Sequence, residues 1–189
     1  IEVFHDPDPE AVERARALGM VASDSDLTLM DRLTSRLTVR AIELRFGELW
    51  MLHACAVGDQ GTGRSVVLVA PSGTGKTTSA LTLGRSFGYL SDETVAIRND
   101  GTILPYPKPL SVLRDGVRPK QQVSPTALGL LEAPAHPQVA AICLLDRTGP
   151  SPPTLQPVST LEALPALAAQ TSAPRLLSRP LHLMAEHLH

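Results

Sequence analysis

Apolar side chains recur with a helical period in the first quarter of the chain. The pattern predicts a helix over Pro9–Leu18 and a longer one over Asp26–Arg45, joined by a polar connection at 21–26. The apolar residues of the longer helix share one face: Met30, Leu33, Leu37, Ala41 and Leu44. Its arginines occupy another face: Arg32, Arg36 and Arg40. We interpret this row as a solvated surface, with a basic binding stripe as the alternative.

Short, continuous apolar runs further along the chain predict buried strands. They cover Leu49–Val57, Ser65–Ala70 and Val139–Leu145, and a further strand with an acidic pair inside it is expected at Tyr89–Ile97. The glycine-rich turn 58–63 should join the first two as an antiparallel hairpin. Residues 118–123 are expected to form a polar loop, and Ser159–Gln170 and Pro180–His189 to be helical. The alternation predicts an α/β fold in which helices flank a mixed central sheet.

Composition narrows the class of protein. The 189 residues suit one compact domain, with an N-terminal segment of helices and strand (1–47) packed on a core with C-terminal helices (48–189). The net charge is −2 with both signs intermixed, so we expect neither a nucleic-acid nor a membrane surface. Cys55 and Cys143 lie in apolar runs and are expected to be reduced, which indicates a cytoplasmic protein. No apolar run is long enough to span a membrane.

The most specific pattern is the glycine-rich loop between the strand at Ser65–Ala70 and the helix that follows. Residues 70–77 read APSGTGKT, close to the phosphate-binding pattern G-x-x-x-x-G-K-[ST] in its strand–loop–helix context. Backbone N–H groups of such a loop converge on an anion, and the helix N-terminus adds positive charge. The residues expected at the phosphates are Ala70, Pro71, Ser72, Gly73, Thr74, Gly75, Lys76, Thr77 and Thr78.

Two residues of this loop have side chains that are expected to act on the phosphates and the metal. A third residue departs from the pattern. Lys76 would bind the β- and γ-phosphates, and Thr77 would place a hydroxyl at a phosphate-bound Mg²⁺. Ala70 stands where the first glycine belongs, and alanine disfavours positive φ, so the loop entry could differ in shape. The alternative is a glycine-rich turn that binds no ligand.

An acid must accompany such a loop to hold the metal, and spacing leaves two candidates open. Asp146 follows the apolar run 139–145, which is a common position for that acid. Asp92 and Glu93 lie inside the first strand after the loop helix. A carboxylate there needs a partner or a metal, because burying it alone is costly.

The segments around the loop resemble the HPr kinase/phosphorylase family and its related serine kinases, including those of peptide natural-product pathways. The resemblance covers about 53–110 and rests on His53, the APSGTGKT loop, LSDETVAI at 90–97 and PYPKPL at 105–110. It implies a P-loop domain of the HPr kinase/PEP carboxykinase type. It also implies ATP and Mg²⁺ as cofactors.

The resemblance assigns roles residue by residue. Asp92 matches the catalytic acid that takes the proton from an acceptor serine, which favours it over Asp146. Glu93 matches a metal-associated acid that is usually one methylene shorter, and Asp92 and Thr77 complete the metal set. Lys76 matches the phosphate-binding lysine, and His53 matches a histidine near the γ-phosphate. His53 as an ordinary core histidine is the alternative.

The expected activity is transfer of a γ-phosphate to an alcohol, with a serine of a peptide or small protein as the acceptor. The phosphorylase signature of the family is not evident, which argues against HPr as the substrate. A small-molecule kinase and a catalytically inactive nucleotide-binding regulator are the alternatives. A homo-oligomer is compatible with the sequence.

Four basic residues are placed by sequence to contact phosphates, although each is individually expected to be a surface charge: Lys108, Arg114, Arg118 and Lys120. His182, His187 and His189 lack the spacing and companions of a metal site.

Overall fold

A computed structural model describes residues 1–114, 117–148 and 154–188, and it divides the chain into two compact units. The N-terminal unit comprises Ile1–Leu44 and Pro109–Ser124, and the core unit comprises Arg45–Lys108 and Pro125–His189. The first division lies close to the boundary expected at residue 47. Pro109–Ser124 belongs to the N-terminal unit although the sequence places it in the second part of the chain.

The N-terminal unit contains two helices and a small parallel sheet. Its elements before residue 45 are β1 (Val3–His5), α1 (Pro9–Ala17), β2 (Val21–Ser23) and α2 (Asp26–Glu43). Asp8 caps α1 by accepting a hydrogen bond from the Glu10 N–H, at 3.0 Å. β2 pairs in parallel with β1 and is buried throughout, so the expected polar connection was wrong. A strand of three residues is too short to show a period.

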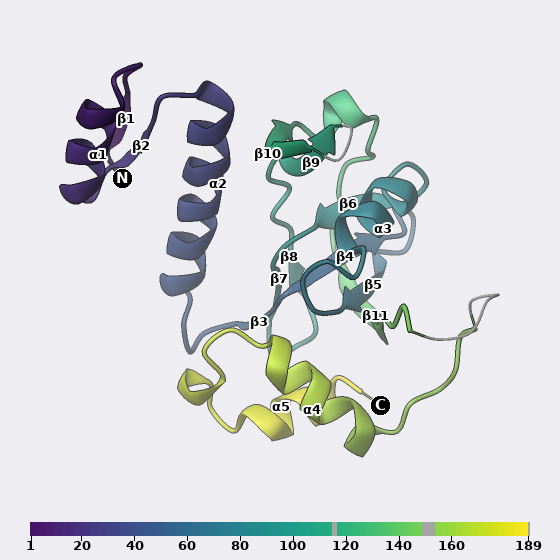
Figure 1. Cartoon of the computed structure of the whole chain (residues 1–189). Coiled ribbons are helices and arrows are strands. Elements are labelled where there is room, and N and C mark those ends of the chain that lie inside the picture. The colour runs from purple at the N-terminus through teal and green to yellow at the C-terminus, as the bar shows by residue number, and fades with distance from the viewer. Residues whose placement is uncertain (115–116, 149–153, 189) are drawn as a thin grey trace. The chain divides into compact units, whose positions relative to one another are not determined.

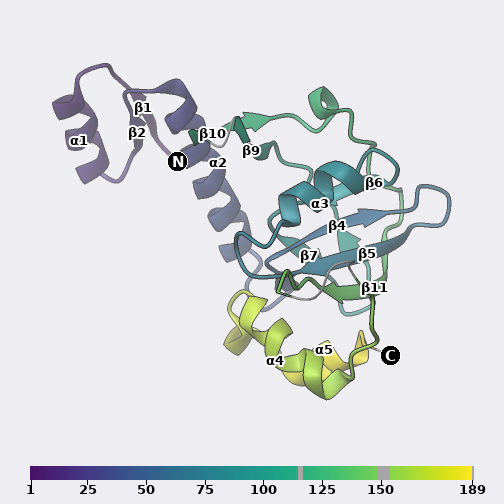
Figure 2. The same cartoon turned by 45° about the vertical axis from the view of Figure 1, so that its right-hand side comes forward.

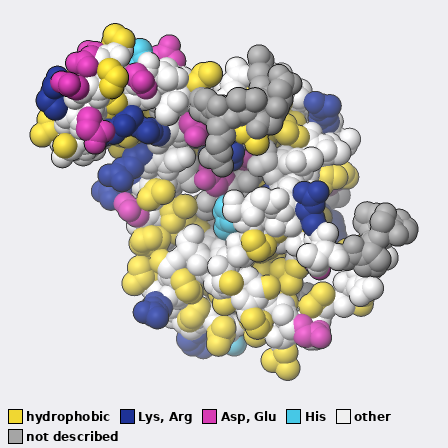
Figure 3. Space-filling model, in the orientation of Figure 1, with side chains coloured by type: hydrophobic (Ala, Val, Ile, Leu, Met, Phe, Trp, Pro, Cys, Tyr) yellow, Lys and Arg dark blue, Asp and Glu magenta, His cyan; other side chains and the backbone are white. Residues whose placement is uncertain are grey.

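The second segment of this unit is a hairpin that packs on α2. It comprises β9 (Leu110–Arg114) and β10 (Val117–Val123), which pair antiparallel. The expectation of a polar loop at 118–123 was therefore wrong. Gln122 donates from Nε2 to Asp31 Oδ1 on α2 and to Ser111 Oγ on β9, both at 2.8 Å. Acidic and basic side chains are interspersed over the helices of this unit (Figure 3).

The core unit is built around a four-stranded mixed sheet with the order β11-β5-β4-β6. Its strands are β4 (Ala54–Gly58), β5 (Arg64–Val69), β6 (Gly88–Ser91) and β11 (Gln138–Leu144). β4 is antiparallel to both β5 and β6, and β11 is parallel to β5, which confirms the predicted hairpin (Figure 2). It follows that β5, β6 and β11 point the same way and end at one edge of the sheet.

A second sheet continues two of these strands. Its order is β3-β7-β8, with β3 (Trp50–Leu52), β7 (Val95–Ile97) and β8 (Ile103–Leu104). The single strands expected at Leu49–Val57 and Tyr89–Ile97 were therefore wrong, because each breaks and passes from one sheet to the other. His53 lies in the first break and 92–94 in the second. Leu52 pairs with Val95, so the two breaks lie at the same level.

Helices cover both faces of the four-stranded sheet (Figure 1 and Figure 2). They are α3 (Lys76–Leu83), α4 (Thr160–Gln170) and α5 (Pro180–Glu186). Val67 and Val69 of β5 belong to the main core cluster with Leu167 of α4 and Met184 of α5. Successive strand residues point to opposite faces, so Leu68 faces the α3 side. The predicted α/β class with a mixed sheet is confirmed.

The C-terminal helices are anchored beside β3. Trp50 donates from Nε1 to Thr171 Oγ1 at 3.1 Å, and the His187 ring stacks on the indole with centroids 5.6 Å apart. Their outer surface remains apolar, with Leu161 and Leu181 exposed, and hydrophobic side chains gather over this region (Figure 3). No helix in the described part of the chain is both long and apolar enough to cross a membrane.

Two shorter elements complete the core unit, and one strand differs from expectation. Thr126–Leu128 and Pro174–Leu176 form single 3-10 turns. β11 was expected to be buried, but its residues are exposed or half-buried, because it forms the edge of its sheet. An apolar run by itself does not distinguish an edge strand from a central one.

Candidate functional site

The loop between β5 and α3 forms an open backbone cradle. Gly73 and Gly75 adopt φ of 84° and 112°, and a Cβ built on either would meet no atom within 4 Å. Space is therefore available beside Gly73 and Gly75, whose positive φ angles favour glycine. Ala70 is buried and is not among the residues of positive φ. Alanine at the first glycine position of the pattern is thus compatible with this loop.

Lys76 folds back over the loop that precedes it. Its Nζ donates to the carbonyl oxygens of Ala70 at 2.6 Å and Pro71 at 2.9 Å. Only 6% of the residue is exposed, and burial lowers its pKa, although the carboxylates of Asp92 and Glu93 oppose that shift. The ammonium thus lies at the mouth of the loop and has backbone partners that a phosphate could replace.

Asp92 is buried immediately beside the start of α3. Thr77 donates from Oγ1 to Asp92 Oδ2 at 3.4 Å, and the Tyr89 hydroxyl donates to Oδ1 at 3.0 Å. Lys108 Nζ lies 3.5 Å from the same Oδ1. The break between β6 and β7 therefore carries the acid to the loop rather than into a strand interior. Three partners from different parts of the chain fix its orientation.

Glu93 is partly exposed and shares Lys108 with Asp92. Lys108 Nζ lies 2.9 Å from Glu93 Oε2, and the side chain of Glu93 is 38% exposed while that of Lys108 is 4% exposed. Burial alone would lower the pKa of Lys108, but the two carboxylates outweigh it and the net pKa is raised. Lys108 therefore stays a cation between two anions.

Two further side chains of the β3–β4 segment, those of His53 and Cys55, lie near Lys76 and the acids. Burial and the nearby Lys76 lower the pKa of His53, so its imidazole is mostly neutral at pH 7. The His53 backbone N–H donates to the carbonyl of Gln170 at 2.8 Å, which ties the break to the end of α4. Cys55 is fully buried, and burial together with Asp92 raises its pKa to about 12. It is therefore an inert thiol.

Asp146 lies on the other side of the loop strand. It follows β11, and the strand order places β5 between β11 and the strands that lead to Asp92. Its Oδ1 accepts from the Thr148 N–H at 2.8 Å and from the Thr148 hydroxyl at 2.7 Å, and these bonds hold its pKa below the usual range. Asp92, and not Asp146, is the acid that contacts the start of the loop helix.

The other expected phosphate contacts are distributed between the units. Lys120 lies on β10 in the N-terminal unit, while the side chains of Arg114 and Arg118 fall outside the described residues. His182 lies 3.1 Å from Glu186 on α5, and His189 is also outside the described residues. Lys108 is therefore the candidate that the core unit places at the acids.

The sequence patterns did not identify Tyr89 as a residue of the site. The available signal was a tyrosine in a buried run three positions before an aspartate, since a buried phenol needs a hydrogen-bonding partner. Burial and the Asp92 carboxylate raise the Tyr89 pKa, so the hydroxyl remains protonated and can donate.

Oxygen atoms at this site suit a hard divalent cation that also binds phosphate. Within the described residues, no three or more His, Cys, Asp or Glu side chains gather as a metal cluster. Mg²⁺ commonly uses one or two carboxylates, several waters and substrate phosphates rather than a complete protein cage. Thr77, Asp92 and Glu93 offer such a partial set, at the end of a loop suited to phosphates.

Comparisons with known proteins assign no family. The chain matches no model of a known protein family, and no curated protein sequence is significantly similar to it.

Proposed function

We propose that this protein is an ATP- and Mg²⁺-dependent phosphotransferase with a P-loop domain of the HPr kinase type. Its γ-phosphate acceptor is an alcohol, a serine of a peptide or small protein. The observation that carries the proposal is the contact between Thr77, at the start of the loop helix, and the buried acid Asp92. A phosphate loop and a carboxylate at one point are what in-line transfer to a hydroxyl needs.

The loop residues provide the binding half of this function. The open cradle at Gly73 and Gly75 receives the phosphates, and Lys76 exchanges its two carbonyl partners for phosphate oxygens. Mg²⁺, when bound, neutralises charge on the phosphates, with Thr77 and the acid pair as its protein ligands. The neutral imidazole of His53 lies near Lys76 and Glu93 and adds no positive charge to the site.

The acids provide the reactive half. Asp92 accepts the proton of the acceptor hydroxyl as that oxygen bonds to the γ-phosphorus, while the bond from this phosphorus to the bridging oxygen breaks and ADP leaves. Tyr89 and Lys108 hold the carboxylate in one orientation through Oδ1. Lys108 also adds a positive charge beside the acids, where it supports the charge that spreads over the phosphoryl oxygens during transfer.

Substitutions at two residues separate phosphate transfer from nucleotide binding. We expect Asp92→Asn to abolish phosphate transfer from labelled ATP to serine-containing peptides while ATP binding, measured by calorimetry, persists. Lys76→Ala should instead lose ATP binding. Glu48→Gln, an exposed acid paired with Arg45, is the matched control and should leave both unchanged. Full phosphate transfer by Asp92→Asn would contradict the role of Asp92 as the proton acceptor. The melting temperature of this variant shows whether it is folded.

A nucleotide-binding protein without transfer activity is the second candidate. The observation in its favour is that only 3% of the Asp92 side chain is exposed and that three partners already engage it. This candidate predicts ATP binding with no product from peptides, free serine or sugar-like alcohols. Product from free serine or a sugar-like alcohol alone would instead identify a small-molecule kinase.

A further inference from the structure

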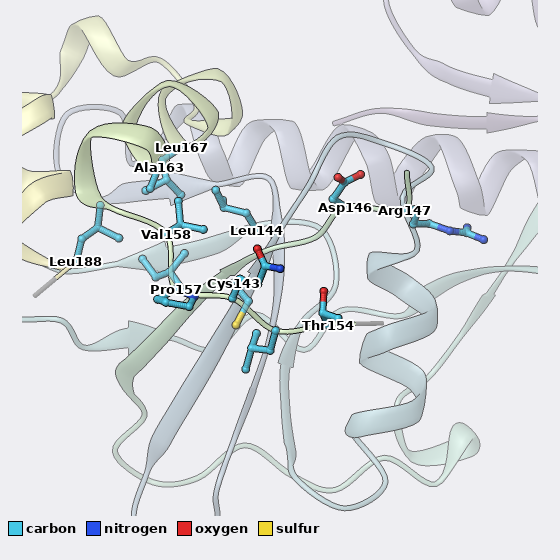
Figure 4. A pocket seen from close by; sticks show the side chains of 13 residues that line it. Cys143, Leu144, Asp146, Arg147, Thr154, Pro157, Val158, Ala163, Leu167 and Leu188 are labelled. Carbon is cyan, nitrogen blue, oxygen red and sulfur yellow. The ribbon is translucent and has the colours of Figure 1, made fainter. Parts of the chain in front are cut away.

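A large cavity opens at the edge strand of the core sheet, beside the carboxyl end of β11 (Figure 4). Its volume is about 1060 Å³, just above the usual range of about 300–1,000 Å³ for small-molecule sites. Its walls come from β11, the segment 154–158 and α4, so they belong to the core unit throughout. Neither the phosphate loop nor the acid pair accounts for this space.

The strand order places the cavity opposite the acids with respect to the phosphate loop. β5, which leads into the loop, lies next to β11 on one side and is separated from β6 by β4 on the other. The Leu145 N–H donates to the Val69 carbonyl at 2.9 Å, so the end of β11 lies directly beside the start of the loop. For a triphosphate whose γ-phosphate lies at Asp92, the strand order therefore leaves the β11 side of the loop for the nucleoside end.

The lining suits a flat heterocycle attached to a sugar. Leu144, Pro157 and Val158 provide apolar wall, as base faces require. Polar side chains join them: Asp146, Arg147, Thr154 and Gln156. The Thr148 hydrogen bonds keep Asp146 a carboxylate, and a carboxylate accepts hydrogen bonds from ribose hydroxyls. The cavity thus combines apolar surface with a few oriented polar groups.

We propose that this cavity binds the base and ribose of the nucleoside triphosphate whose phosphates occupy the loop at 70–77. The inference rests on the proposed function, because it needs the phosphates in that loop. It gives Asp146 a binding role in place of the metal-binding role that sequence spacing suggested. Specificity for the nucleotide then resides on β11 and the segment 154–158, away from the acid pair.

Cys143 supplies a test on the unaltered protein. It lines the cavity, whereas Cys55 is fully buried and has its pKa raised to about 12. A maleimide should therefore label Cys143 selectively, and Cys143→Ala should abolish the labelling. We expect ATP at ten times its dissociation constant to slow labelling about tenfold, and inorganic tripolyphosphate at the same saturation to leave it unchanged. Equal labelling rates with and without ATP would overturn the proposal.

A larger side chain placed in the cavity provides the second test. Cys143→Trp should weaken ATP binding about tenfold or more while tripolyphosphate affinity stays within about twofold. Ala140→Trp, at an exposed position of the same strand outside the cavity lining, is the matched control and should change neither affinity. Loss of both affinities in Cys143→Trp would indicate misfolding, and the labelling experiment then decides.

The two ligands also separate this inference from the function on which it rests. Binding of ATP no tighter than tripolyphosphate, with no effect of Cys143→Trp, would overturn the cavity site and leave the phosphate loop intact. Failure of both ligands to bind the unaltered protein would overturn the proposed function and the cavity site together.

Discussion

Lys108 illustrates at the residue scale how the candidate site is held. Its buried ammonium lies 3.5 Å from Asp92 Oδ1 and 2.9 Å from Glu93 Oε2. A buried carboxylate without such a partner is expensive, and the Tyr89 and Thr77 hydroxyls provide hydrogen bonds but no charge. Lys108 therefore supplies the positive charge that compensates the buried acid used by the proposed chemistry.

Removing this cation should be costly. We expect Lys108→Met to lower the free energy of unfolding by about 3 kcal/mol or more, since it leaves Asp92 buried and uncompensated. Denaturant titration measures the change. Arg45→Met is the control, because Arg45 and Glu48 are both 60% exposed and such a pair contributes at most about 1 kcal/mol. The double variant Lys108→Met/Asp92→Asn should regain part of the loss, and a double variant less stable than Lys108→Met would contradict this account.

At the element scale, the β4–β5 turn fixes the hairpin that presents the phosphate loop. Asp59 Oδ1 accepts from the Thr62 N–H at 2.8 Å, and the Gly63 N–H donates to the Asp59 carbonyl at 2.8 Å. The turn also receives β11, because the Gln138 N–H donates to the Gly63 carbonyl at 2.9 Å. The glycines of this turn therefore have a structural role, as the sequence predicted.

Two glycines of this turn differ in what a side chain would meet. Gly63 has φ of 73°, and a Cβ there would collide with the His136 carbonyl oxygen. A Cβ at Gly61 would lie 3.6 Å from Asp59 Oδ1, an ordinary contact. We expect Gly63→Ala to cost about 2 kcal/mol or more and Gly61→Ala less than about 0.5 kcal/mol in unfolding free energy. Equal costs would show that the turn does not need a left-handed residue at 63.

At the scale of the whole molecule, the described residues of the core unit bury more hydrophobic side chains than those of the N-terminal unit. One cluster of the N-terminal unit has Val12, Ala15 and Ala22 as its buried members, and Val21, Leu29 and Leu110 are buried as well. The cluster of the core unit includes Trp50, Leu52, Leu167 and Met184 among many others. Because buried apolar area is the main source of stability, the core unit should be the more stable of the two.

This difference should separate the two unfolding transitions. Trp50 is the sole tryptophan and lies in the core unit, whereas α1 and α2 contribute much of the helix. On heating, we expect far-UV circular dichroism to lose signal at a lower temperature than Trp50 fluorescence. Coincident transitions would show that the two units unfold as one.

The sequence determined the features whose residues are near neighbours in the chain. The phosphate loop could be recognised because a strand, two glycines, Lys76 and Thr77 fall within a short stretch, and the turn at 58–63 could be read from its own glycines and aspartate. The helical period of the apolar residues likewise predicted α1 and α2. Each of these depends on local backbone geometry, which nearby residues set.

Only the tertiary structure decided which distant residues meet. Asp146 follows an apolar run and Asp92 lies inside the segment expected as the first strand after the loop helix, and the sheet order places Asp92 at Thr77 and Asp146 across β5. The partners Tyr89 and Lys108, the paired breaks at His53 and Asp92, and the edge position of β11 likewise follow from strand pairing. Hydrophobic pattern reports whether a segment is apolar, but not which segment will pack against it, because that choice is made by the whole fold.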